Sequence, residues 1–292
     1  MASKALTYSN LLKDYIVLTK PGIVLLVLIT TLTGMYFAQR GFPNPWLVFW
    51  TLLGTGLASA GSAVLNQFFD RDIDALMNRT KDRPLPAGSV NPKNAFIFGS
   101  FLLVLSAFIL LFEVNLLTFF FVALASFFYV VVYTLALKRK SPLATEIGGI
   151  SGSLPPVIGY AAVKGEVGVE ALILFLIMFM WQPPHFWVLA IKYSEDYKGA
   201  NIPTLPVAKG IAHTKMKTLI YTASLVPLSL LPFFYGISGP IYFFSALILS
   251  GLHLLLTLKF VFSKKPNGMF LFFYSVLYIA LLFSIMVFDM RR

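Results

Sequence analysis

The sequence predicts an all-α polytopic membrane protein, a single bundle of about nine transmembrane helices. The first observation behind this prediction is composition. Of 292 residues, 58% are hydrophobic and only 12% are charged, and the mean hydropathy is +0.81. Soluble domains usually carry about 25% charged residues. The second observation is a series of long apolar runs, and the third is the distribution of Lys and Arg between them.

Each apolar run is long enough for a membrane-spanning helix, which needs about 20 residues. The loops between them are short, and no linker or soluble segment separates them. Residues 1–292 are therefore predicted to form one membrane domain. The predicted spans are roughly 22–39, 46–68, 94–113, 115–135, 143–163, 168–190, 216–235, 239–260 and 268–288.

Basic residues lie almost entirely in alternate loops. If the N-terminus is cytoplasmic, only Arg40, Lys164, Arg291 and Arg292 of the 23 Lys and Arg residues fall outside the cytoplasmic side. Cytoplasmic loops carry this excess in membrane proteins. The pattern predicts a cell-membrane protein with a cytoplasmic N-terminus and an outer-face C-terminus, and it places the polar loops 66–93 and 191–215 together on the cytoplasmic side.

The same pattern explains the net charge of +11 without nucleic acid, which we exclude as a partner. The chain has no cysteine, so disulfides and thiolate metal sites are excluded too.

The first polar loop begins with three oxygen-bearing side chains spaced four residues apart: Asn66, Asp70 and Asp74. If the second span continues through them as a helix, they share one face. Carboxylates stacked in this way repel one another unless a cation lies between them. Oxygen ligands suit Mg²⁺, which commonly bridges one or two carboxylates to substrate phosphates. The triple is thus predicted to hold Mg²⁺.

Basic residues follow the triple and would bind the remaining phosphate charge: Arg71, Arg79 and Arg83. The alternative is that these side chains and their acidic neighbours only form a solvated, salt-bridged loop that obeys the positive-inside rule.

The second polar loop, residues 181–210, repeats this pattern of an apolar span that runs into charges. Its candidates are Lys192, Asp196 and Lys198. Lys192 and Asp196 are four residues apart, which fits an ordinary ion pair at a helix end. The alternative places the Lys192 ammonium on a phosphate and the Asp196 carboxylate on the metal.

Three segments together resemble the UbiA superfamily of intramembrane prenyltransferases. They read "NQFFDRDIDALMNRTKDRPLPAG", "KRKSPLATEIGGISGSLPPVIGYAA" and "WQPPHFWVLAIKYSEDYKGANIPTLPV". The first marks the superfamily, while "PPHFW" and "SGSLPPVIGY" narrow the resemblance to its heme-modifying branch. The resemblance covers nearly the whole chain. One departure concerns the second acidic motif, where many members have two aspartates four residues apart and this chain has Lys192 and Asp196.

The resemblance implies farnesyl diphosphate and heme B as substrates, Mg²⁺ as cofactor, and a surrounding lipid membrane. It implies catalytic roles for Asn66, Asp70, Asp74, Lys192 and Asp196. It also suggests heme A synthase and oxidase assembly proteins as partners. Ionisation of the diphosphate would leave an allylic cation, which a porphyrin vinyl group attacks before water quenches the product.

His185 follows Pro183 and Pro184 within the sixth predicted span. Heme iron accepts a histidine nitrogen, so axial ligation is one hypothesis. Proton transfer and a hydrogen-bonded position in the helix core are the others. Two rival functions remain open: prenyl transfer to a quinone precursor or another aromatic acceptor, and transport of an organic anion, since transporters also have intramembrane acids and broken helices.

Overall fold

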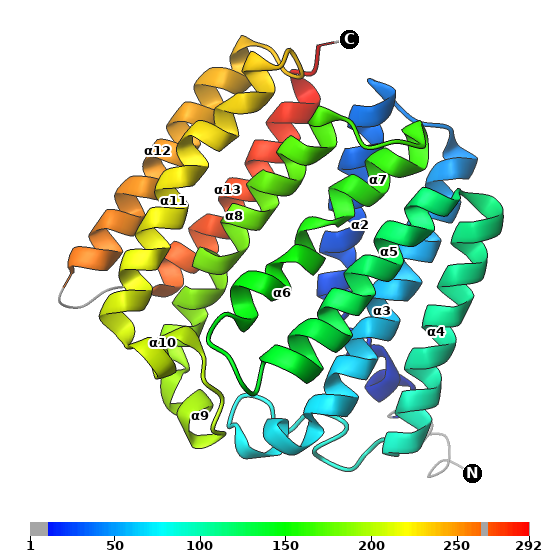
Figure 1. Ribbon diagram of the computed structural model, residues 1–292, viewed down its shortest axis with the longest axis vertical. Coiled ribbons are helices and arrows are strands. Elements are labelled where there is room, and N and C mark those ends of the chain that lie inside the picture. Colours follow the sequence, from blue (N-terminus) through cyan, green and yellow to red (C-terminus); the bar gives the residue numbers. More distant parts are fainter. Residues whose placement is uncertain (1–10, 264–267, 292) are drawn as a thin grey trace.

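The computed structural model describes residues 11–263 and 268–291, so Arg292 lies outside the described residues. Within these ranges the chain is helical (Figure 1), and the predicted all-α membrane bundle is confirmed. The elements are α2 (Pro21–Gln39), α3 (Pro45–Leu76), α4 (Pro92–Glu113), α5 (Leu116–Phe127), the π-helix η1 (Phe128–Leu137), α6 (Ala144–Ser153), α7 (Pro155–Lys164), α8 (Val169–Lys192), α9 (Ser194–Gly199), α10 (Leu205–Lys209), α11 (Ile211–Phe234), α12 (Pro240–Phe262) and α13 (Gly268–Phe288).

Among the described residues, eight helical segments are long and apolar enough to cross a membrane. They match eight of the nine predicted spans. The remaining span, 143–163, is divided into the two short helices α6 and α7 at Leu154. Pro155 and Pro156 cause this break, because a proline lacks the N–H of the helical hydrogen bond and its ring clashes with the preceding turn.

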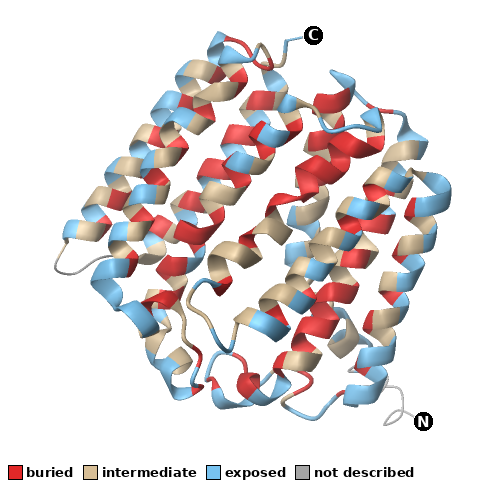
Figure 2. Ribbon diagram, in the orientation of Figure 1, coloured by how far each residue is buried: buried red, intermediate tan, exposed pale blue. Residues whose placement is uncertain are grey.

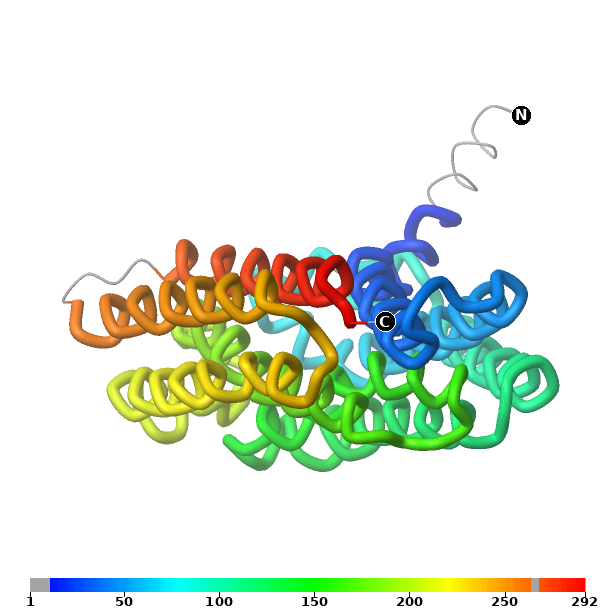
Figure 3. The backbone as a smooth tube through the Cα atoms, turned by 90° about the horizontal axis from the view of Figure 1, so that it is seen from above, coloured from blue at the N-terminus to red at the C-terminus, as the bar shows by residue number. Residues whose placement is uncertain are grey.

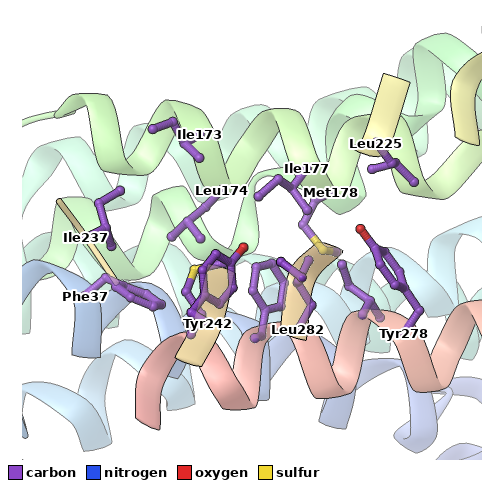
Figure 4. Close-up of a cluster of buried hydrophobic side chains, with 14 residues drawn as sticks. Phe37, Ile173, Leu174, Ile177, Met178, Leu225, Ile237, Tyr242, Tyr278 and Leu282 are labelled. Carbon is purple, nitrogen blue, oxygen red and sulfur yellow. The ribbon is translucent and has the colours of Figure 1, made fainter. Parts of the chain in front are cut away.

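Most long helices run roughly parallel, and the view along them shows a flattened arrangement (Figure 3). In that view α12, α13 and α2 follow one another along one long side. The helices α8, α11, α12 and α13 pack together, and their shared core includes Leu174, Ile177, Leu225, Tyr242 and Tyr278 (Figure 4).

The other close association joins α2 to α7 and depends on glycine. A Cβ built on Gly34 would lie 2.0 Å from the carbonyl oxygen of Pro156, and one on Gly159 would lie 1.9 Å from that of Thr31. Only glycine allows two backbones to approach so closely. This contact fixes α2, whose first turn leads into the site described below.

Burial separates inner helices from peripheral ones (Figure 2). In the most apolar window of α8, 61% of residues are buried, and in that of α3 50%, whereas α4, α11 and α12 each have 28%. Large apolar side chains such as Phe101, Phe108 and Leu255 are exposed on those peripheral helices. Surfaces of this kind face lipid tails in a multi-pass membrane protein.

Candidate active site

The helix α3 is long enough to cross the membrane and continue beyond it. Asn44 caps its start by accepting a hydrogen bond from the Trp46 amide, and Pro45 occupies the first turn, where proline is favoured. Asn66 lies about 32 Å along the axis from Pro45, whereas the hydrocarbon core is about 30 Å thick. The predicted continuation of the second span through the polar triple is confirmed, and it places these residues at the membrane boundary.

All three residues of the predicted triple are buried: Asn66, Asp70 and Asp74 have exposures of 4%, 0% and 2%. The amide of Asn66 connects them to the surrounding elements. Its Nδ2 donates to Asp70 Oδ2 at 2.8 Å and to Thr134 Oγ1 of η1 at 3.0 Å, and its Oδ1 accepts from Lys20 Nζ at 2.8 Å. We use the name "the cluster" for these polar residues together with the cations around them: Lys20, Asn66, Asp70, Asp74, Arg83 and Lys138.

Each carboxylate of the cluster is paired with one cation. Lys138 forms an ion pair with Asp70, and Arg83 Nη1 lies 2.7 Å from Asp74 Oδ2. Unpaired buried carboxylates would be costly, so these pairs stabilise the end of α3. Both cations keep some exposure, 16% for Lys138 and 27% for Arg83, and therefore still reach an incoming anion.

The position of Lys138 depends on the π-helix. Its amide donates to the Tyr133 carbonyl at 2.8 Å, five residues back. The wider turn advances each residue by a smaller angle than an α-helix does, and this sets the direction of Lys138 toward α3. Tyr129 and Tyr133 stack at 5.9 Å on the same element, beside the cluster.

Lys20 immediately precedes α2 and lies among these charges. Burial, with help from the positive charges of Arg83 and Lys138, lowers its pKa to about 7. Its hydrogen bonds are to neutral groups, Asn66 and the hydroxyl of Tyr129 at 3.3 Å, and the nearby carboxylates of Asp70 and Asp74 offset the effect of burial only in part.

The donor set fits Mg²⁺. Asp70 Oδ1 is buried and has no hydrogen-bond partner, and an orphaned carboxylate oxygen of this kind needs a ligand. Across residues 11–263 and 268–291, no group of three or more Asp, Glu, His or Cys side chains forms a metal-binding cage. Mg²⁺ is usually held by one or two carboxylates plus substrate phosphates, which is what Asp70 and Asp74 offer.

Among the described residues, Asp196 does not join the carboxylates of α3 in such a group, and its role as a fourth metal ligand stays a prediction. Its Oδ1 instead lies 3.5 Å from Asn78 Nδ2. The alternative of an ordinary helix-end ion pair between Lys192 and Asp196 is wrong: no such pair forms among the described residues, and α8 ends at Lys192 while α9 begins at Ser194. Lys192 is exposed and lies over the ring of Tyr193.

The two polar loops nevertheless meet, as the sequence predicted. Arg79 Nη2 contacts the hydroxyl of Tyr197 at 3.3 Å, and Ile73 and Met77 pack against Ala200 and Ile202. Arg79 therefore bridges the loops rather than pairing with the triple.

Two other predicted diphosphate ligands lie away from the cluster. Arg71 Nη1 donates to the Phe68 carbonyl at 2.6 Å, and the guanidinium covers the Phe68 ring. Lys198 is exposed on α9. Of the predicted basic residues, only Arg83 pairs with a carboxylate of the triple.

His185 lies in the core of the four-helix group and not in the cluster. Its Nδ1 is hydrogen-bonded to Ser275 Oγ at 2.6 Å, and its ring stacks on Phe272 at 4.2 Å and on Trp181 at 4.8 Å. His253 and Thr222 line the same tightly packed region. Axial ligation of heme would use Nε2 and would require these helices to separate, and it stays a prediction.

Sequence reasoning missed Lys20 and Lys138 as members of the site, and it missed the nearby ion pair of Arg139 with Asp72 outside the cluster. Arg139 binds Asp72 with both Nη atoms, at 2.6 and 2.7 Å. The only signal available was their place at the ends of the first and fourth predicted spans, on the same side as the triple.

Comparison with known proteins identifies the class of protein to which this fold and site belong. The model of the UbiA prenyltransferase family matches residues 27–285. The chain therefore belongs to the UbiA prenyltransferase family. A protoheme IX farnesyltransferase from Aquifex aeolicus is 61% identical over 292 residues, covering 100% of both chains. The protoheme IX farnesyltransferase of Neorickettsia sennetsu is 42% identical and covers 95% of this chain and 92% of its own.

Solved structures share the fold. A structure from work on digeranylgeranylglyceryl phosphate synthase has a TM-score of 0.81 at 20% identity and covers 96% of this chain and 98% of its own. A UbiA homologue from Archaeoglobus fulgidus bound to DMAPP and Mg²⁺ has a TM-score of 0.63 at 20% identity, and the coverages are 94% and 99%.

Proposed function

We propose that this chain is a protoheme IX farnesyltransferase, a heme O synthase that joins the farnesyl group of farnesyl diphosphate to a vinyl group of heme B. The observation that carries this proposal is the full-length identity of 61% to a protein of that name. The cluster supports it chemically, because it gathers carboxylates and cations at the membrane boundary, where a lipid diphosphate would place its head group.

The reaction breaks the bond between the first farnesyl carbon and the diphosphate oxygen. A carbon–carbon bond forms to the vinyl group, and water supplies the hydroxyl group of the product while a proton is released. In this scheme Arg83 and Lys138 orient the diphosphate and stabilise its growing negative charge by charge-assisted hydrogen bonds. Asp70 and Asp74 would hold Mg²⁺, which when bound supplies additional positive charge for the departing diphosphate.

The stacked rings of Tyr129 and Tyr133 support the cationic step. They lie beside the cluster on η1, where a farnesyl chain attached to the diphosphate would begin. An aromatic face stabilises a cation by about 0.5–2 kcal/mol, and neighbouring hydrocarbon keeps water from the cation before the vinyl group reacts.

On the heme side, we propose that His185 contacts the porphyrin iron through Nε2. Histidine is a common axial ligand, and the Ser275 hydrogen bond to Nδ1 would orient the ring. A His185→Phe variant keeps an aromatic ring for stacking and removes the ligand. It should change the heme absorption spectrum of the purified protein; an unchanged spectrum and unchanged turnover would assign His185 to helix packing.

A pigment assay tests the proposed function. Purified protein in lipid receives farnesyl diphosphate, heme B and Mg²⁺, and the hemes are separated by chromatography. A more hydrophobic heme with the added mass of farnesyl and water is expected. If no new heme forms and a prenylated aromatic acid appears when 4-hydroxybenzoate replaces heme, the chain belongs to the quinone branch instead. Uptake of an organic anion into vesicles without diphosphate release would indicate a transporter.

A further inference from the structure

Lys20 has an unusual backbone conformation for its position. Its φ and ψ are 52° and 64°, in the left-handed region, and Pro21 follows directly. A left-handed conformation is strained for a residue other than glycine, and a following proline disfavours helical conformations further. Lys20 is also the N-terminal capping residue of α2 but makes no side-chain capping bond. The Lys20 carbonyl accepts the Ile23 amide at 2.9 Å, so its backbone begins the helix while its side chain is directed elsewhere.

The Lys20 side chain extends to the other residues of the cluster, on α3 and η1. The ammonium donates to Asn66 Oδ1 at 2.8 Å and to the Tyr129 hydroxyl at 3.3 Å. Asn66 Oδ1 is the only oxygen of that amide, so it is the atom that a metal ion would have to take. A lysine and a metal ion compete for it.

The other two cations of the cluster are bound differently. Lys138 and Arg83 each pair with a carboxylate, whereas Lys20, among the described residues, forms no ion pair within 4.0 Å. Both of its acceptors are neutral. An ammonium held only by neutral oxygens on a flexible four-carbon stem is the cation of the three that moves most easily.

We infer that Lys20 is an exchangeable cation of the active site, which occupies Asn66 Oδ1 before the metal binds and transfers to the diphosphate when Mg²⁺ and farnesyl diphosphate enter. This inference rests on the proposed function. A diphosphate carries more negative charge than one Mg²⁺ neutralises, and Lys138 and Arg83 share their positive charge with Asp70 and Asp74. Lys20 supplies the missing positive charge without the burial of another unpaired group.

The test compares Lys20→Met with Lys13→Met, an exposed lysine of the same N-terminal segment that serves as the matched control. Calorimetry measures two affinities of each purified variant: Mg²⁺ alone, and farnesyl diphosphate with saturating Mg²⁺ and no heme. Because Lys20 competes with the metal but binds the diphosphate, its loss should tighten Mg²⁺ binding and weaken farnesyl diphosphate binding, each by about tenfold or more. Lys13→Met should match the wild type in both.

Opposite changes of the two affinities distinguish exchange from a structural role, which would weaken both together. Parallel weakening, or two unchanged affinities, overturns the inference while wild-type binding still supports the proposed function. A wild-type protein that binds no farnesyl diphosphate contradicts both. If Lys20→Met does not fold, Lys20→Gly suits the left-handed backbone and is expected to show the same opposite changes.

Discussion

At the residue scale, the cluster depends most on Asp70, which is fully buried and connects α3 to the end of η1. Its Oδ2 accepts hydrogen bonds from Asn66 Nδ2 and Lys138 Nζ, while its Oδ1 has no hydrogen-bond partner. A carboxylate arranged in this way combines a fixed orientation with a free ligand position. Its hydrogen-bond partner Asn66 also donates to Thr134, so the orientation is maintained by α3 and η1 together.

Asp70→Asn should lower turnover by at least about a hundredfold, because the amide keeps the volume but loses the charge that binds metal and Lys138. Steady-state formation of the farnesylated heme measures the effect. Asp72→Asn is the matched control on the same helix, since the Asp72 side chain is 61% exposed and binds Arg139 outside the cluster. Comparable activity of the two variants would contradict the assignment of the metal site to Asp70.

The residues of the cluster could be predicted only in part from the sequence. Asn66, Asp70 and Asp74 were recognisable because their spacing is a property of one helix. Lys20 and Lys138 were not, because their contacts depend on a left-handed residue and on a π-helix. Asp196 was predicted as a ligand from its place in the second acidic motif, and this role stays a prediction. The bend at Tyr193, with φ of −104° and ψ of 23°, could not be predicted from the four-residue spacing of Lys192 and Asp196.

At the scale of elements, the α2–α7 contact places the active-site lysine. The chain needs glycine at both crossing positions, so α2 and α7 behave as one unit, and α7 is joined to α6 only through the break at Leu154. A displacement of α2 would therefore move Lys20 relative to α3 without any change to the other residues of the cluster.

Gly159→Ala should destabilise the protein by about 1–3 kcal/mol, the usual cost of overpacking, because its Cβ would overlap the backbone of Thr31. Gly251→Ala in α12 is the control: a Cβ there meets nothing within 4 Å, and alanine has the higher helix propensity. Thermal unfolding in detergent compares the two. An equal melting temperature for Gly159→Ala and wild type would contradict the claim that the close approach of α2 and α7 stabilises the protein.

The breaks in the helical pattern were predictable where proline causes them, as at Pro155 and Pro156. The number of spans was predictable from apolar length, including the one that divides into α6 and α7. The pairing of α2 with α7 was not, since a single glycine on each helix carries no periodic signal that identifies its partner.

At the scale of the whole molecule, the arrangement brings both polar loops to one end of the bundle and leaves the α7–α8 turn at the other (Figure 1). We propose that the end with the cluster is cytoplasmic, as the Lys and Arg distribution indicates. Heme and farnesyl diphosphate would then approach the head-group region from the cytoplasmic leaflet.

The absence of cysteine makes this orientation easy to measure. Ala87→Cys and Val167→Cys introduce thiols at exposed positions, one at each end of the bundle. A membrane-impermeant maleimide should label Val167→Cys in intact cells and Ala87→Cys only after permeabilisation. The reverse pattern would place the cluster on the outer face, and labelling of both in intact cells would contradict a membrane-spanning arrangement of the intervening helices.

The most direct test of the account is diphosphate release by purified protein supplied with farnesyl diphosphate and heme B, measured before and after complete chelation of divalent cations. We predict that release stops on chelation and returns when Mg²⁺ is added to the wild-type protein, but not when it is added to Asp70→Asn. Release at the same rate without divalent cations would contradict the central claim that the buried carboxylates of α3 act by holding a metal ion against the diphosphate.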